Sequence, residues 1–142
     1  MERVKNFINE HNTLTLATSN GQKPAAAAVF YTYIKNDNLL LFVSSKKSEH
    51  IMNCKEQPNC AATIQEDGLE WSVIKGLQIK GEVSLAEDKY WNDYLEKYPY
   101  IKTDKKLSAA LEKVDLYKLE IKWVRLIDNS KGFGNREEHT LN

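Results

Sequence analysis

Residues 13–43 read TLTLATSNGQKPAAAAVFYTYIKNDNLLLFV, and this stretch decides the fold. It contains three runs whose alternation and β-branched or aromatic content are typical of strands, and the last is apolar enough to be buried on both faces. The connections are short and rich in Asn, Gly and Asp, which tolerate the backbone angles of tight turns. The stretch therefore predicts a three-stranded antiparallel meander. Its strands are Thr13 to Ser19, Ala25 to Ile34 and Leu39 to Val43.

The segments around the meander add helices and three longer-range strands. Predicted helices cover Glu2 to His11, about Ser48 to Glu56, Asp88 to Tyr98 and roughly Asp104 to Lys113. Predicted strands cover Asn59 to Gln65, Ser72 to Leu85 and Asp115 to Asp128, and a polar tail runs from Asn129 to Asn142. Gly76 and Gly81 stand where a barrel strand bends or bulges. We expect one α+β domain over residues 1–142, built on a small six-stranded antiparallel β-barrel with flanking helices.

Composition excludes several classes of function. The chain has 142 residues with 20 basic and 20 acidic side chains, and this balance disfavours nucleic acid, which needs clustered positive charge. The longest apolar stretch is too short to span a bilayer, and polar residues interrupt any apolar segment of a signal peptide. Cys54 and Cys60 are too few for a disulfide framework. We expect a soluble cytoplasmic protein with reduced thiols and no membrane partner.

Familiar catalytic signatures are missing from the sequence. His11, His50 and His139 are isolated, the Cys54–Cys60 spacing fits no zinc pattern, and no phosphate-binding glycine loop is present. No metal site is predicted, and no side chain is assigned as catalytic. Any chemistry would then come from a cofactor.

The segment Leu41 to Ile51, LFVSSKKSEHI, places hydroxyls and lysines between a strand end and a helix start. Unpaired backbone N–H groups and the positive end of the helix dipole meet at such a place, which suits a phosphate. The dipole is expected to lower the pKa of His50 there. An alternative interpretation is an ordinary helix N-terminus with Ser45 or Ser48 as the N-cap.

The run Ala25 to Phe30 contains four alanines in a predicted strand, where alanine is depleted. Small side chains let a flat ring lie close to the backbone. The alternative is a tightly packed barrel interior or a helix contact.

The segment Asp128 to Gly134, DNSKGFG, places an aromatic residue between two glycines beyond the last predicted strand. Phe133 has no obvious core of its own, so it is a candidate to reach a partner subunit or to cover a ligand. A frayed terminus with an incidental Phe is the alternative.

Together these segments resemble the pyridoxamine 5′-phosphate oxidase-like split β-barrel flavoproteins. The likeness covers about Val4 to Arg136 and is strongest to a subgroup of small, uncharacterised bacterial members. That subgroup shares the pattern G-x-Q-x-K-G-E, here Gly76 to Glu82, and the ending D-N-x-x-G-F-G, here Asp128 to Gly134.

The resemblance implies a homodimer with FMN bound at the subunit interface. The residues expected to hold the phosphate are Ser44, Ser45, Lys47, Ser48 and His50. The flavin ring is expected along Ala26, Ala27, Ala28, Val29 and Phe30, beside Lys75 and Gly76. Lys131 and Phe133 are expected to approach the ring from the partner subunit.

Departures from the family pattern argue against oxidation of pyridoxamine phosphate itself. The oxidases carry a lysine on the second strand, where this run ends in Phe30-Tyr31, and a glutamine that aligns with Gly76. Their C-terminal Arg-x-His is not matched, because Arg136 and His139 are three apart. Glu49 replaces a basic residue of the phosphate loop.

The leading hypothesis is a dimeric FMN-dependent oxidoreductase acting between a small electron donor and a small acceptor. The rival is a non-catalytic split-barrel module that carries flavin, haem or another flat ligand.

Overall fold

The predicted meander forms the first half of one antiparallel sheet. In the computed structural model, which describes residues 1–141, β1 (Thr13–Ser19) pairs with β2 (Pro24–Ile34), and β2 pairs with β3 (Leu39–Ser44). β3 is buried on both faces, as its apolar run predicts, because Leu40 and Phe42 face the barrel interior while Leu39 and Leu41 face a helical cap.

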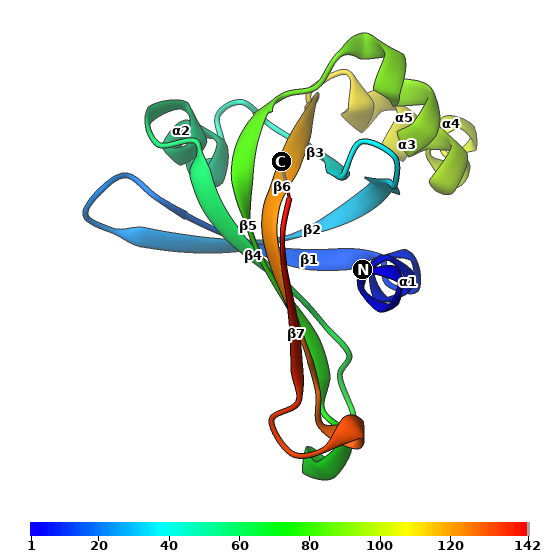
Figure 1. The fold of residues 1–142 in the computed structure, drawn as a ribbon. Helices are drawn as coiled ribbons and strands as arrows, with labels where there is room; N and C mark the ends of the chain where they lie inside the picture. Colours follow the sequence, from blue (N-terminus) through cyan, green and yellow to red (C-terminus); the bar gives the residue numbers. More distant parts are fainter. Residues whose placement is uncertain (142) are drawn as a thin grey trace.

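Three more strands close the barrel. β4 (Asn59–Gln65) pairs with β1, β5 (Lys75–Leu85) pairs with β4, and β6 (Asp115–Asp128) pairs with β5. The first half of β6 also pairs with β3, so strands β3-β2-β1-β4-β5-β6 form a closed ring. The expected six-stranded antiparallel barrel is confirmed (Figure 1).

A seventh strand corrects the expected polar tail. After a 3-10 turn at Asn129–Lys131, β7 (Arg136–Thr140) folds back and pairs with the second half of β6. Its sequence, REEHT, has no apolar alternation because it lies outside the closed ring, so nothing in the hydrophobic pattern indicates a strand there. Asn142, the end of the predicted tail, lies outside the described residues.

The helices cover the two ends and one side of the barrel. The spacing of Val4, Phe7, Ile8 and His11 at i, i+3, i+4 and i+7 predicts one buried helix face. α1 (Glu2–Asn9) buries the first three, and His11 lies beyond its end and is half-buried. α2 (Glu49–Glu56) follows β3. The predicted helix at 88–98 begins with a 3-10 turn (Asp88–Tyr90) and continues as α3 (Trp91–Lys97), and the next is divided into α4 (Tyr100–Thr103) and α5 (Lys105–Leu111). Among residues 1–141, no helix is long and apolar enough to cross a membrane.

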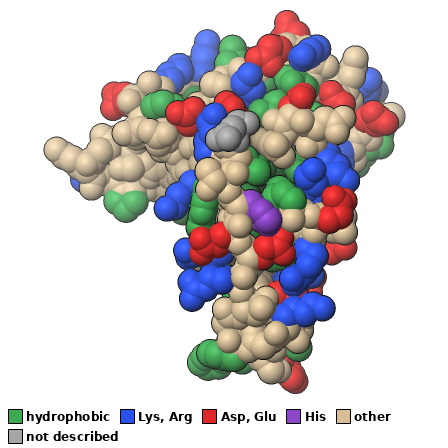
Figure 2. All heavy atoms as spheres, in the orientation of Figure 1, with side chains coloured by type: hydrophobic (Ala, Val, Ile, Leu, Met, Phe, Trp, Pro, Cys, Tyr) green, Lys and Arg blue, Asp and Glu red, His purple; other side chains and the backbone are tan. Residues whose placement is uncertain are grey.

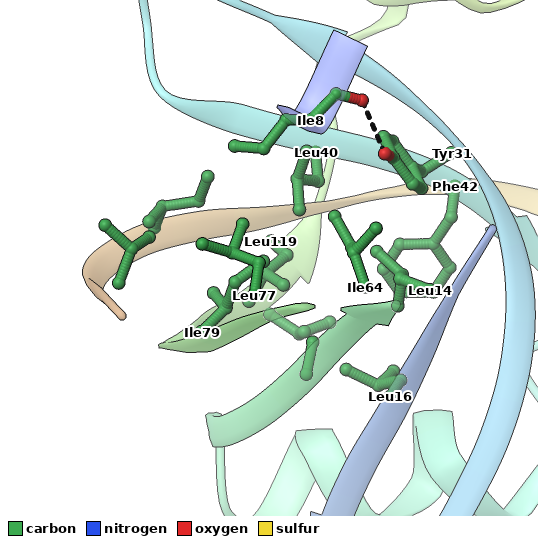
Figure 3. Packing of buried hydrophobic residues seen from close by; sticks show 14 of the residues in the cluster. Ile8, Leu14, Leu16, Tyr31, Leu40, Phe42, Ile64, Leu77, Ile79 and Leu119 are labelled. Atoms are coloured by element: carbon green, nitrogen blue, oxygen red, sulfur yellow. Dashed lines mark hydrogen bonds between the residues drawn. The ribbon is translucent and has the colours of Figure 1, made fainter. Parts of the chain in front are cut away.

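The core lies inside the barrel and continues beneath α1 and α2. Figure 3 shows Ile8 of α1 above the barrel residues, with the Tyr31 hydroxyl donating a hydrogen bond of 2.6 Å to the Ile8 carbonyl. A second cluster packs α3 against the outside of β3 through Tyr90, Tyr94 and Tyr98. The helical spacing of Tyr90, Trp91 and Tyr94 predicts packing or dimer contacts, and within one chain Tyr90 and Tyr94 are buried packing residues of the cap.

β5 is kinked at one of its two glycines. The register of the β5–β6 ladder shifts between Lys80 and Gly81, so the expected bulge occurs at Gly81. A Cβ atom at Gly81 would lie 2.2 Å from the Glu120 carbonyl oxygen, whereas one at Gly76 would lie 3.6 Å from its nearest neighbour. Gly81 is therefore required by close backbone approach, and Gly76 is not. The predicted start of this strand at Ser72 is wrong, because Trp71–Val73 form a 3-10 turn.

Candidate functional site

The loop between β3 and α2 gathers three serines and one histidine. The Ser44 hydroxyl oxygen lies 2.7 Å from Nε2 of His50 and 3.0 Å from the Ser48 hydroxyl oxygen. The Ser48 hydroxyl donates to the Ser45 carbonyl over 2.7 Å. Since each hydroxyl has a single proton, the contacts are all satisfied when His50 donates to Ser44 and Ser44 donates to Ser48. The loop thus holds a directed chain of hydrogen bonds.

The first turn of α2 lacks a side-chain cap. Ser48 occupies the N-cap position with extended backbone angles, but its hydroxyl bonds back to Ser45 instead of to the helix. The first backbone N–H groups of the helix therefore receive no acceptor from the N-cap side chain. Donors of this kind, together with the exposed Lys47 ammonium, attract an anion.

His50 is held neutral by its surroundings. Burial lowers its pKa, and the neighbouring Glu49 carboxylate opposes that effect only in part. The pKa of His50 is thus lowered, as expected, but the main cause is burial and not the helix dipole. Glu49 itself is exposed to solvent, and it makes no hydrogen bond to Ser44, Ser45 or Ser48 among the described residues.

The alanine run of β2 forms half of an exposed shelf. Ala26, Ala28 and Phe30 are exposed on one face of the strand, while Ala25, Ala27 and Val29 are half-buried on the other. Ala26 and Ala28 therefore face outward, away from the barrel interior. Across the sheet, small residues of β1 and β4 continue the same face. They are Ala17, Thr15, Ala61 and Thr63.

This shelf leads into an open hollow on the outer face of the sheet, which sequence reasoning missed. Its volume is about 510 Å³, and it reaches from Ala17 on β1 to Lys122 on β6. Beside it, Trp123 lies between two cations, with Lys80 and Arg125 each 4.9 Å from a ring centroid. The alternating exposed positions of β4, β5 and β6 could have indicated this face, but only once their register was known.

The helical cap supports the end of the shelf. The Tyr94 hydroxyl donates to the Phe30 carbonyl over 3.3 Å, and the Lys97 ammonium donates to the Tyr31 carbonyl over 2.9 Å. The Phe30 ring is 56% exposed and meets Tyr98 edge-on. These cap residues position β2, a role that the sequence did not assign to Lys97.

The remaining predicted residues lie at the other end of the molecule. Lys131 and Phe133 follow β6 in the arm that projects from the barrel away from α2, formed by the 3-10 turns at residues 71–73 and 129–131 with the adjoining strand ends (Figure 1). Lys75 and Gly76 begin β5 at the base of this arm, where the Lys75 ammonium lies 5.5 Å from the Phe7 ring centroid of α1. The Asn129 side chain ties this arm together by donating to the Trp71 carbonyl over 3.0 Å. One chain therefore brings together the serines and His50, but it does not bring Phe133 to them.

The tip of the arm is apolar and exposed. Phe133 is 79% exposed and Trp71 is 72% exposed, and Val73 and Ile74, which follow Trp71 closely in sequence, are exposed as well. Figure 2 shows the hydrophobic side chains gathered at this tip. Gly132 and Gly134, at φ of 121° and 75°, provide the turns that present Phe133 to solvent.

The two cysteine thiols are not activated as nucleophiles, and the described histidines and cysteines form no metal-binding group. Burial raises the pKa of Cys54 to about 11 and that of Cys60 to about 12, so both thiols stay protonated at neutral pH. Within residues 1–141, no group of three or more His, Cys, Asp or Glu side chains is arranged to hold a metal ion.

A closed six-stranded barrel with a capping helix after its third strand defines the chain as a split β-barrel protein. Residues 1–128 match the family described as pyridoxamine 5′-phosphate oxidase. The chain belongs to that family. The uncharacterised UPF0306 protein of Yersinia pestis is 26% identical over 137 residues, which cover 94% of this chain and 88% of the relative.

Solved structures share the fold at lower identity. The haem-binding protein of Mycobacterium smegmatis superposes with a TM-score of 0.75 at 20% identity, over 98% of this chain and 57% of that one, so this chain spans little more than half of its length. An FAD-binding protein of Mesorhizobium loti gives a TM-score of 0.66 at 18% identity, over 87% and 90% of the two chains. The fold is thus found in proteins with either kind of flat cofactor.

Proposed function

We propose that this protein is a homodimeric FMN-binding oxidoreductase in which the β3–α2 loop holds the flavin phosphate. The observation that carries the proposal is the uncapped start of α2 beside the chain of serine hydroxyls and Lys47. A phosphate dianion accepts hydrogen bonds from hydroxyl, ammonium and backbone N–H donors, and charge-assisted hydrogen bonds contribute about 1.5–3 kcal/mol each.

The donor set fits the phosphate of FMN. Ser44, Ser45 and Ser48 supply hydroxyls that can rotate toward an anion, and the single N–H of neutral His50 donates to Ser44 or, when Ser44 rotates, to the anion. Glu49 is exposed, so water screens its repulsion of a phosphate held by these donors. The phosphate can therefore be bound in spite of the acidic residue in the loop.

The shelf of small residues on the outer face of β2 fits the flavin ring. The short side chains of Ala26 and Ala28 let a flat ring approach the backbone closely, and Phe30 beside them provides an apolar contact. A flat ring on this shelf lies against backbone and small side chains, which shields one of its faces from water. FMN, when bound, supplies reversible hydride or electron transfer, and the protein's part is to bind and orient it.

A second copy of the chain supplies the other side of the proposed site. The serine loop and the Phe133 tip lie at opposite ends of the folded molecule, so a site that uses both needs two copies of the chain. Trp71 and Phe133 are large apolar side chains that a single chain leaves exposed to water, and an interface between two subunits would bury them. In this arrangement Lys131 and Phe133 cover the ring bound to the other subunit.

The test is the visible absorption spectrum of the purified protein with added FMN. An oxidoreductase is expected to retain the yellow cofactor and to lose its colour under NADH or NADPH without oxygen. A protein that neither retains FMN nor is reduced contradicts the proposal.

A haem-binding module is the second candidate, because an open shelf of small and apolar residues accepts any flat ring. Titration with haemin distinguishes the two. A strong Soret band that persists in competition with excess FMN favours haem.

A further inference from the structure

A second hollow lies between α2 and strands β5 and β6, and Lys46 of the β3–α2 loop is at its edge. Its volume is about 380 Å³, within the range of small-molecule sites. The buried side chains of Ile51, Cys54 and Val83 form an apolar lining. Ser44, Ser45, Ser48 and His50 do not line it, and the proposed function makes no use of the hollow.

Tyr117 lines this hollow with an unpaired hydroxyl. The residue is 6% exposed, and its ring is fixed by stacking on Phe42 at 5.8 Å. Among residues 1–141, its hydroxyl has no hydrogen-bond partner, although Tyr31, Tyr94 and Tyr98 all donate to backbone carbonyls. Burial raises the pKa of Tyr117, with Asp115 adding to the effect, so the phenol stays protonated and can donate. The Tyr117 hydroxyl is not among the fully buried unpaired atoms, so it opens into the hollow and can donate a hydrogen bond to a ligand there.

The rim of the hollow carries a net positive charge. Lys46 lines it from the β3–α2 loop, Lys55 lines it from the last turn of α2, and Asp115 lines it from the start of β6. No ion pair joins any of these three to another described residue, so both ammonium groups are available to an anion. Charge and lining together select a molecule with an apolar body and a negative group.

From these observations we propose that the hollow binds a small apolar carboxylate, either a medium-chain fatty acid or an aromatic acid. The apolar body lies against Ile51 and Val83, while the carboxylate accepts a hydrogen bond from Tyr117 and pairs with Lys46 or Lys55. Cys54 contributes only an apolar wall, because its thiol stays protonated.

The test is isothermal titration with octanoate and with octylamine, which have equal chain length and opposite charge. No flavin is added, so the outcome does not depend on the proposed function. Octanoate is expected to bind at least tenfold more tightly than octylamine and to raise the melting temperature. Equal affinity of the two, or no binding of octanoate, overturns the proposal.

Two variants locate the site. The double substitution Lys46→Gln with Lys55→Gln is expected to weaken octanoate binding at least tenfold. The matched control, Lys105→Gln with Lys106→Gln on α5, removes the same charge from exposed positions elsewhere and is expected to leave affinity unchanged. An equal loss of octanoate affinity in the two double variants would show only general electrostatic attraction and would overturn the assignment of this hollow as the binding site.

Tyr117→Phe keeps the ring and removes the hydroxyl. Octanoate binding is expected to weaken severalfold, with little change in melting temperature since the hydroxyl has no protein partner. Unchanged affinity contradicts the role of Tyr117.

Discussion

Nε2 of His50 lies 2.7 Å from the Ser44 hydroxyl oxygen, and this contact joins the first turn of α2 to the end of β3. The two residues are six apart in sequence, and the loop between them contains the other proposed phosphate donors. Since burial lowers the pKa of His50, the contact is made by a neutral imidazole. The proposed socket therefore depends on a histidine that resists protonation.

Acid is expected to destabilise the protein through His50. Its pKa is near 6.5 in the unfolded chain and lower in the native state, so below about pH 6.5 the unfolded chain takes up a proton that the native protein does not. The free energy of unfolding should then fall as the pH falls from about 7 toward 5. Urea unfolding of the native protein and of His50→Gln measures this, and the variant should show a shallower fall. Parallel pH profiles would show that His50 titrates alike in both states.

Lys47→Glu is expected to weaken FMN binding by about ten- to a hundredfold, since it removes a charge-assisted donor and places a negative charge beside the phosphate. Lys47 is exposed, so the fold should persist. Lys113→Glu, also an exposed lysine, makes the same charge change far along the chain and serves as the control. Titration by flavin fluorescence measures both, and equal effects in the two variants would count against the loop.

Gly81→Ala is expected to destabilise the protein by about 1–3 kcal/mol, because its Cβ atom would lie 2.2 Å from the Glu120 carbonyl oxygen. Gly76→Ala provides a control on the same strand, since its Cβ atom would lie 3.6 Å from the nearest atom. Thermal unfolding should separate the two variants by several degrees. Similar melting temperatures would mean that the bulge can relax without cost.

The double substitution Trp71→Ala with Phe133→Ala is expected to convert a dimer into a monomer, because it removes the apolar tip of the arm. FMN affinity should fall in parallel, since the proposed site takes residues from two copies. Tyr100→Ala with Leu107→Ala, exposed apolar residues of the cap, is the control. Analytical ultracentrifugation gives the oligomeric state, and a native protein that sediments as a monomer contradicts the interface.

The features that could be predicted from the sequence are those that depend on residues close together in the chain. The spacing of Val4, Phe7 and Ile8 predicted the buried face of α1, and the apolar run of β3 predicted burial on both faces. Ser44, Ser48 and His50 were predicted together because they are near in sequence. β7 was missed because a wholly polar strand outside the ring carries no hydrophobic alternation.

Relationships between distant segments could not be predicted in this way. The pairing of β3 with β6 joins residues far apart in the chain, and so does the contact of Lys97 with the Tyr31 carbonyl. The distance between the serine loop and Phe133 likewise depends on the closed barrel. The resemblance to a family predicted the barrel, which the structure and the family match confirm.

The most direct test of the phosphate socket compares FMN with riboflavin, which has the same ring and no phosphate. FMN is expected to bind the native protein at least a hundredfold more tightly, and Lys47→Glu should remove most of that difference while leaving riboflavin affinity unchanged. Equal affinity of the native protein for the two flavins would contradict the claim that the β3–α2 loop holds a phosphate.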